Sequence, residues 1–190
     1  LLVGSPMCTA FSAWQYINNR KRDPTLVARE YVRAMVHIRF VMELYAIQHA
    51  AGRYFLHEHP AGAMSWAEAE VRQIALMPNV VTVVGDQCQY NAEDKMGAPI
   101  RKPTKFMTNS SCIGNALSRR CSGKLGMCSR PKGGHHALCN GARAKAAAIY
   151  PFALCRAILT GFRDQMVADG RLDRGAVWLN CVMLDEGQAE

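Results

Sequence analysis

The chain has 190 residues, of which 49% are hydrophobic, and its formal net charge is +8. These totals indicate a globular chain long enough for one domain with a real core. They exclude a membrane-spanning protein, because no apolar run approaches the length of a span, and nothing at the amino terminus resembles a secretory signal. We expect an intracellular protein with no membrane partner, nuclear if the organism is a eukaryote.

The chain opens on an apolar run, 1–3, that is interrupted before Pro6. Proline lacks the N–H that strand pairing needs, so a buried parallel strand is predicted to end here. Cys8 would then lie on the loop at the carboxyl end of this strand, where open α/β sheets place their chemistry. A helix beginning at Ser12 would favour the thiolate and make Cys8 a nucleophile. The alternative is a half-buried cysteine at a strand end.

The next two predicted elements are a helix and a strand. Apolar residues recur at helical spacing over 26–51 and predict a long amphipathic helix. A short apolar strand at 53–60 follows and carries Glu58 near its end. A parallel crossover would set Glu58 beside Cys8 at one rim of the sheet, whereas the alternative is a solvated carboxylate at a strand end.

The second half of the chain continues the α/β pattern, which predicts a Rossmann-like sheet with flanking helices and a small basic insertion rich in Cys and His. The remaining predicted elements are a helix capped by Ser65 that runs to about residue 77, a strand at 80–85 buried on both faces, a basic strand at 101–108 and a helix at 146–162.

The insertion contains three thiols and a histidine within nineteen residues, which suits a tetrahedral structural zinc. The alternative is a set of unpaired cysteines in a flexible loop, and His136 is an alternative to its neighbour as the histidine. The predicted zinc ligands are Cys121, Cys128, His135 and Cys139.

Positive charge is concentrated in the segment 101–145, which has ten Lys or Arg and no Asp or Glu. Such a segment is typical of a polyanion partner, most simply nucleic acid, although a solvated basic loop is the alternative. The residues predicted to contact nucleic acid are Lys102, Thr104, Lys105, Arg119, Arg120, Lys124, Arg130 and Lys132.

Two ordered blocks resemble the DNA cytosine-5 methyltransferases. Residues 4–12 read Gly-Ser-Pro-Met-Cys-Thr-Ala-Phe-Ser and are similar to the family's nucleophile motif, Gly-small-Pro-Pro-Cys-polar-x-Phe-Ser, with Met7 in place of the second proline. The strand end Glu58-His59-Pro60 resembles the family's Glu-Asn-Val, or the Glu-Asn-Pro of phage-type members, with His59 in place of Asn.

Two later blocks extend this resemblance to about residue 162. The run 87–90, Gln-Cys-Gln-Tyr, together with 102–104, Lys-Pro-Thr, is similar to a phage-type block that approaches the target nucleotide. Tyr150-Pro151 resembles the opening of the family's terminal helix, which packs beside the cofactor.

The resemblance implies methyl transfer from S-adenosylmethionine to carbon 5 of cytosine in DNA. Cys8 would add to carbon 6, while Glu58 would bind ring nitrogen 3 and the exocyclic amine of a flipped base. The resemblance further implies catalytic roles for Pro6 and Arg101, a nucleic-acid contact for Ser12, and cofactor contacts for Ser5, Tyr150 and Pro151.

The same resemblance divides the chain into parts. Residues 1–108 would be the catalytic α/β part, 109–147 a target-recognition region, 148–170 a terminal helix packing back, and 171–190 a tail in which 178–184 could form a strand or a tether. The family's glycine-rich cofactor block is not in this sequence, and because residue 1 is not Met, we expect that block upstream in a longer phage-type or retrotransposon protein.

Two other functions stay open. One is an inactive nucleic-acid-binding zinc module derived from such an enzyme, which the departures Met7 and His59 make credible. The other is a cysteine hydrolase in which Cys8 works with His57 or His59.

Overall fold

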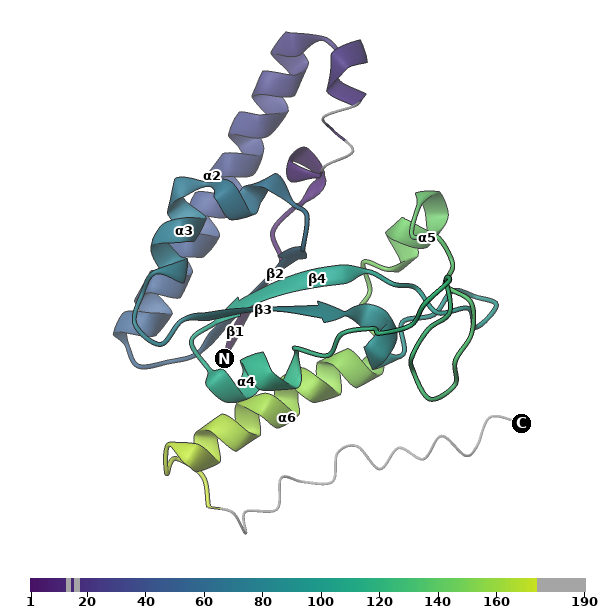
Figure 1. The fold of residues 1–190 in the computed structure, drawn as a ribbon. Helices are drawn as coiled ribbons and strands as arrows, with labels where there is room; N and C mark the ends of the chain where they lie inside the picture. The colour runs from purple at the N-terminus through teal and green to yellow at the C-terminus, as the bar shows by residue number, and fades with distance from the viewer. Residues whose placement is uncertain (13–14, 16–17, 174–190) are drawn as a thin grey trace, which may run out of the picture.

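The computed structural model describes residues 1–12, 15 and 18–173, so the segment 178–184 lies outside the described residues. Its centre is a four-stranded sheet with the order β1-β2-β4-β3 (Figure 1). The strands are β1 (Leu2–Gly4), β2 (Phe55–Pro60), β3 (Val81–Asp86) and β4 (Pro103–Thr108). β1 is parallel to β2, and β4 runs antiparallel between β2 and β3. The strands β1, β2 and β3 therefore all end at one rim, which we call the carboxyl rim.

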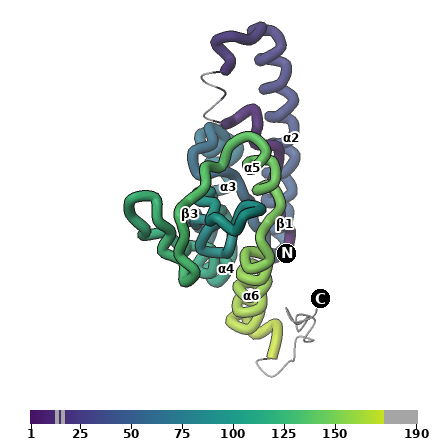
Figure 2. The backbone as a smooth tube through the Cα atoms, turned by 90° about the vertical axis from the view of Figure 1, so that its right-hand side faces the viewer, coloured from purple at the N-terminus to yellow at the C-terminus, as the bar shows by residue number. Residues whose placement is uncertain are grey.

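Helices cover both faces of this sheet, as expected for an α/β chain (Figure 2). One face packs against α2 (Pro24–Ala50) and α3 (Ala69–Ala75), and the other against α4 (Ser111–Ala116) and α6 (Phe152–Ala168). The short helix α5 (Gly141–Ala146) comes directly before α6 in the chain.

Side chains that alternate along the strands contribute to a hydrophobic core on each face of the sheet. Phe55 and Met107 belong to the core under α2, while Leu56 and Phe106 belong to the core over α6. Since successive strand residues point to opposite faces, the next residues of β2 divide in the same way. His57 and His59 face the α2 side, and Glu58 faces the α6 side.

The helix expected over 26–51 is present as α2, and its start follows from local chemistry. The Asp23 side chain accepts a hydrogen bond from the Thr25 N–H (2.8 Å), and Pro24 occupies the first turn, where its missing N–H costs nothing. At the other end Gly52 has φ of 62°, a conformation that ends helices easily.

One predicted element differs from the structure. The strand expected at 80–85 to be buried on both faces is an edge strand with Thr82 exposed, because β4 rather than β3 is inserted beside β2. The turn Thr9–Phe11 follows Cys8 directly and ends at Ser12. Beyond it, the described residues Gln15 and Asn18 are helical, and the Gln15 N–H donates to the Ser12 carbonyl (2.9 Å).

Two helix boundaries also shift. The helix expected from Ser65 divides into the turn Met64–Ala67 and α3, and the last helix begins at Phe152 rather than 146. Within the described residues, no helix is long and apolar enough to cross a membrane.

Candidate functional site

Cys8 and Glu58 lie at the same carboxyl rim. The parallel register sets Gly4 beside His57, so the residues that follow β1 meet the end of β2. The hydroxyl of Ser5 donates a hydrogen bond to Glu58 Oε2 (2.6 Å). Ser5 and Cys8 belong to the same segment between β1 and the turn Thr9–Phe11, so this hydrogen bond ties the segment that carries the thiol to Glu58.

Glu58 is a buried carboxylate with unused hydrogen-bonding capacity. Its residue is only 4% exposed, and Oε1 has no hydrogen-bond partner. The hydroxyl of Tyr150, also buried, lies next to Ser5 and Glu58 but forms no hydrogen bond of regular geometry. Burial, reinforced by the Glu58 charge, raises the pKa of Tyr150 and keeps its hydroxyl a donor. An acceptor and a donor are thus both available to a ligand.

Unpaired buried polar atoms gather at this rim. Among the described residues, four such side-chain atoms lie at the ends of β2 and β3 or two residues before α6, and the fifth is Nε2 of His57. Buried polar groups are normally paired, so a cluster without partners is typical of a site that a ligand completes. The four atoms are Glu58 Oε1, Asp86 Oδ1, Gln87 Oε1 and the Tyr150 hydroxyl.

The thiol of Cys8 is half-buried and precedes the turn Thr9–Phe11. Burial, and after it the Glu58 charge, raises the pKa of Cys8, while the nearby Lys102 ammonium acts in the opposite direction. Lys102 is held by a hydrogen bond from its Nζ to the carbonyl of Ala147 (3.0 Å), so the segment before α6 reaches over the rim.

His59 shapes the loop that carries the thiol. Its Nε2 donates to the carbonyl of Pro6 (2.8 Å), and its Nδ1 accepts from the Ser65 hydroxyl (2.6 Å). His57 lies on the same face, with Nδ1 against the Tyr45 hydroxyl (3.2 Å). Neither ring forms a hydrogen bond to Cys8, so the geometry gives no support to a cysteine–histidine hydrolase.

Four side chains in the described part of the chain form a cluster that could hold a metal ion. The ligand atoms of Cys88, Cys121, Cys128 and His136 all lie within 4.8 Å of one another. Although burial opposes it, hydrogen bonds from the Ser129 N–H and hydroxyl lower the pKa of Cys121 to about 6, which favours the thiolate that metals bind.

Two of the predicted ligands, Cys121 and Cys128, belong to the cluster. Of the two alternative histidines it is His136 that joins them, because His135 is exposed, and Cys88 takes the place predicted for Cys139. The loop hydrogen bond from the His136 N–H to the Gly126 carbonyl (2.7 Å) helps to place that ring. The sequence analysis did not identify Cys88 as a ligand because it lies in the turn that follows β3 and not in the loop. The available signal for this ligand was a cysteine just after the end of a strand.

Asp86 connects this cluster to the carboxyl rim. It is fully buried at the end of β3, and its Oδ2 accepts from the Cys121 N–H (2.8 Å) and from Arg120 Nε (3.0 Å). Arg101 Nη2 lies 3.7 Å from the same oxygen and 3.5 Å from the Cys121 carbonyl. Arg120, expected at the nucleic acid, and Arg101, expected to be catalytic, therefore balance a buried carboxylate.

The other residues expected to bind nucleic acid lie in different environments. Arg130 is buried and bonds Glu93 (2.5 Å) and two loop carbonyls, so the structure gives it a role inside the loop and corrects its assignment to nucleic acid. Thr104 is buried and accepts a hydrogen bond from Gln87. Lys105 lies 4.9 Å from the centre of the Trp66 ring, on the α2 face.

The basic insertion 109–147, which we call the basic loop, carries exposed positive charge. Its exposed predicted contacts include Arg119, Lys124 and Lys132. The guanidinium of Arg119 lies over the Tyr90 ring, 5.5 Å from its centre. Pro151 is the residue that precedes α6, and Ser12 is half-buried at the end of the turn after Cys8.

Comparisons with protein-family models, with curated proteins and with solved structures find no match for this chain. Its function is therefore inferred from the side chains at the carboxyl rim and in the Cys/His cluster.

Proposed function

We propose that this chain is the base-binding, nucleophile-bearing part of a DNA cytosine-5 methyltransferase-like protein. The observation that carries the proposal is the meeting of Cys8 and Glu58 at one rim, with Glu58 buried, held by Ser5 and unpaired at Oε1. A carboxylic group with one free oxygen suits the edge of cytosine that carries ring nitrogen 3 and the amine.

The strand order supports this proposal. β1 and β2 are parallel neighbours that end at the same rim, where Cys8 follows β1 and Glu58 lies near the end of β2. β4 runs in the reverse direction between β2 and β3 and does not separate these two strands.

The residues at the rim suit covalent addition to a pyrimidine. A thiolate of Cys8 would form a bond to carbon 6, and the double bond between carbons 5 and 6 would open with its electrons delocalised toward nitrogen 3. Glu58, entering as the carboxylic acid, would donate its proton to that nitrogen and become the carboxylate, which neutralises the charge developing in the ring, and Lys102 would favour the thiolate. The base must leave the duplex, and the exposed Arg and Lys of the loop would hold its flanking phosphates.

Two of the three residues that the resemblance assigns to the cofactor, Ser5 and Tyr150, have their hydroxyls next to Glu58, and the Ser5 hydroxyl donates to this carboxylate. S-adenosylmethionine, where bound, would supply the methyl group to carbon 5. The proposal for this chain's own residues is limited to binding the base and forming the covalent bond.

We further propose that the Cys/His cluster holds a zinc ion. Three thiolates and one imidazole are a common structural zinc set. Because Cys88 follows β3 and the other three ligands come from the loop, the metal would fasten the basic loop to the carboxyl rim. The loop would then present its exposed charges next to the base-binding residues.

A second candidate is a nucleic-acid-binding zinc module without catalysis. The observation that favours it is the raised pKa of Cys8, which keeps the thiol protonated at neutral pH in the unliganded chain.

One experiment separates the two candidates. The full-length native protein is incubated with S-adenosylmethionine and a duplex containing 5-fluorocytosine, and covalent complexes are resolved by denaturing electrophoresis. We expect an adduct that Cys8→Ser abolishes, that Glu58→Gln slows by at least about 100-fold, and that Cys112→Ser, on α4, leaves unchanged. Salt-dependent binding without any adduct would reject catalysis and support the second candidate.

A further inference from the structure

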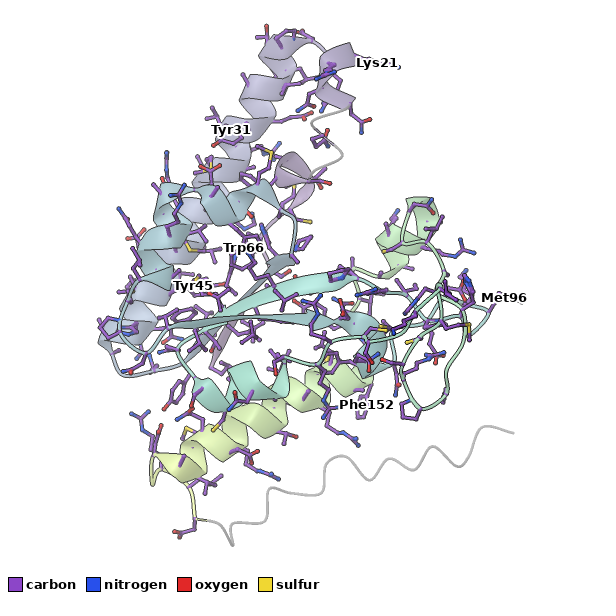
Figure 3. The ribbon with its side chains drawn as sticks, in the orientation of Figure 1. Lys21, Tyr31, Tyr45, Trp66, Met96 and Phe152 are labelled. Carbon is purple, nitrogen blue, oxygen red and sulfur yellow. The ribbon has the colours of Figure 1, made fainter. Side chains whose placement is uncertain are left out.

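The helix α2 has a second apolar face that none of the described residues covers. Its first face packs on the sheet, and Tyr45 points from it to the strands, with its hydroxyl donating to the Gly4 carbonyl (3.1 Å; Figure 3). On the opposite side Val36 is 61% exposed, Phe40 56% and Ile47 51%. A helix of a single domain normally carries polar residues there, so these side chains indicate an interaction surface.

The residues on this face follow the spacing of a two-stranded coiled coil. Their intervals alternate between four and three, which keeps side chains in a single seam along the helix. We call this set the α2 seam, and its residues are Arg29, Arg33, Val36, Phe40, Glu43 and Ile47.

The α2 seam is complementary to the same seam of a second copy when the two helices run antiparallel and their midpoints lie at the level of residue 38. Val36 then meets the partner's Phe40, Arg33 meets the partner's Glu43, and the stem of Arg29 lies over the partner's Ile47. A parallel arrangement would instead oppose Arg33 to its own copy and Glu43 to its own copy. Charge therefore specifies one orientation as well as one partner.

The surroundings of α2 leave this seam accessible. The helix α3 and the segment before it bind another side of α2, where Arg39 pairs with Glu70 (2.7 Å) and Tyr31 donates to Glu68 (2.9 Å). Arg33 and Glu43 form no ion pair within the described residues. Their charges are thus available to a second molecule.

From this pattern we infer that two copies of the chain associate through α2 as an antiparallel, two-fold symmetric dimer. A two-fold axis makes every contact occur twice, so Val36 and Phe40 form a four-residue apolar centre flanked by two ion pairs. The inference is independent of the proposed chemistry, because no residue of the seam lies at the carboxyl rim.

The dimer is tested by analytical ultracentrifugation of the full-length protein over a range of concentrations. We expect a concentration-dependent dimer whose dissociation constant rises at least about tenfold in Phe40→Asp, since a buried carboxylate would replace the apolar centre. Leu159→Asp is the matched control, because Leu159, at 51%, is nearly as exposed as Phe40, at 56%, but lies on α6. A wild-type monomer at all concentrations, or equal effects of both variants, would overturn the inference.

Charge exchange tests the antiparallel register itself. Arg33→Glu and Glu43→Arg should each weaken the dimer, because each sets like charges opposite one another twice. The double variant should restore it, and an equimolar mixture of the two single variants should form a mixed dimer. Retained weakening in the double variant, or no mixed dimer, would reject this register. Circular dichroism of each variant checks that α2 still folds.

Discussion

At the scale of the residue, two charges of opposite sign act on Cys8. Burial, and after it the Glu58 charge, raises the pKa of its thiol, and Lys102 lowers it. His59 fixes the loop in which the thiol is held, through the Pro6 carbonyl. In this position a ligand that screens Glu58 would leave Lys102 as the dominant charge acting on the thiol.

This electrostatic balance predicts the reactivity of the thiol. In Glu58→Gln the repulsion from the carboxylate disappears, so the pKa of Cys8 falls and more thiolate is present at pH 8. We expect Cys8 to be alkylated faster by iodoacetamide in this variant, and slower in Lys102→Met, as measured by mass spectrometry of the modified peptide. Unchanged pH profiles in both variants would show that neither charge reaches the thiol.

The positions of Cys8 and Glu58 at the strand ends could be predicted from the sequence. Prolines after two apolar runs predicted that Cys8 and Glu58 end neighbouring strands, and the register of β1 and β2 places them together. The unpaired hydroxyl of Tyr150 beside them could not be predicted as a contact of Glu58, because it depends on how the segment before α6 folds over the rim.

At the scale of the element, the Cys/His cluster joins the turn after β3 to the basic loop. Hydrogen bonds already bring the two together, because Asp86 accepts from the Cys121 N–H and Gln89 donates to the thiols of Cys88 and Cys128 (3.6 Å each). A metal would replace these weak sulfur contacts with strong bonds.

Metal analysis can distinguish the cluster that includes Cys88 from the loop-only ligand set, which includes Cys139 instead. The purified protein should contain one equivalent of zinc by elemental analysis. Cys88→Ser should lower zinc affinity by at least about tenfold, whereas Cys139→Ser should leave it unchanged, because Cys139 is outside the cluster. A metal-free protein would reject the site, and the reverse order of the two variants would favour the loop-only ligands.

At the scale of the whole molecule, α2 and the base-binding carboxylate lie on different faces of the sheet. Glu58 faces the α6 side, whereas α2 packs on the opposite face, and the amino-terminal half of α2 extends beyond the sheet beside the turn Thr9–Phe11 (Figure 1). A dimer through α2 would therefore leave the α6 face of each copy open.

The free energy of unfolding should depend on pH because His57 is buried in its neutral form. Burial, and after it the neighbouring His59, lowers the pKa of His57 to about 3. The unfolded chain binds this proton near pH 6.5 and the folded chain does not, so the free energy of unfolding falls as pH drops from about 6.5 toward 3. The expected slope from this group is up to about 1.4 kcal/mol per pH unit.

Urea unfolding at pH 7 and pH 4.5 measures this slope. His57→Leu removes the titrating ring, so the difference in unfolding free energy between the two pH values should shrink relative to wild type. An equal difference in both proteins would mean that His57 is not the group responsible.

The amino-acid sequence by itself determined the α/β class, the long helix α2, the residues that end β1 and β2, and the basic insertion. These features follow from apolar spacing, prolines and local charge, which act over a few neighbouring residues. Only the tertiary structure decided that β4 lies between β2 and β3, that Arg130 is buried, and that Cys88 and His136 complete the metal cluster. These outcomes depend on pairing and packing between distant segments, and the local pattern does not encode which distant partners are chosen.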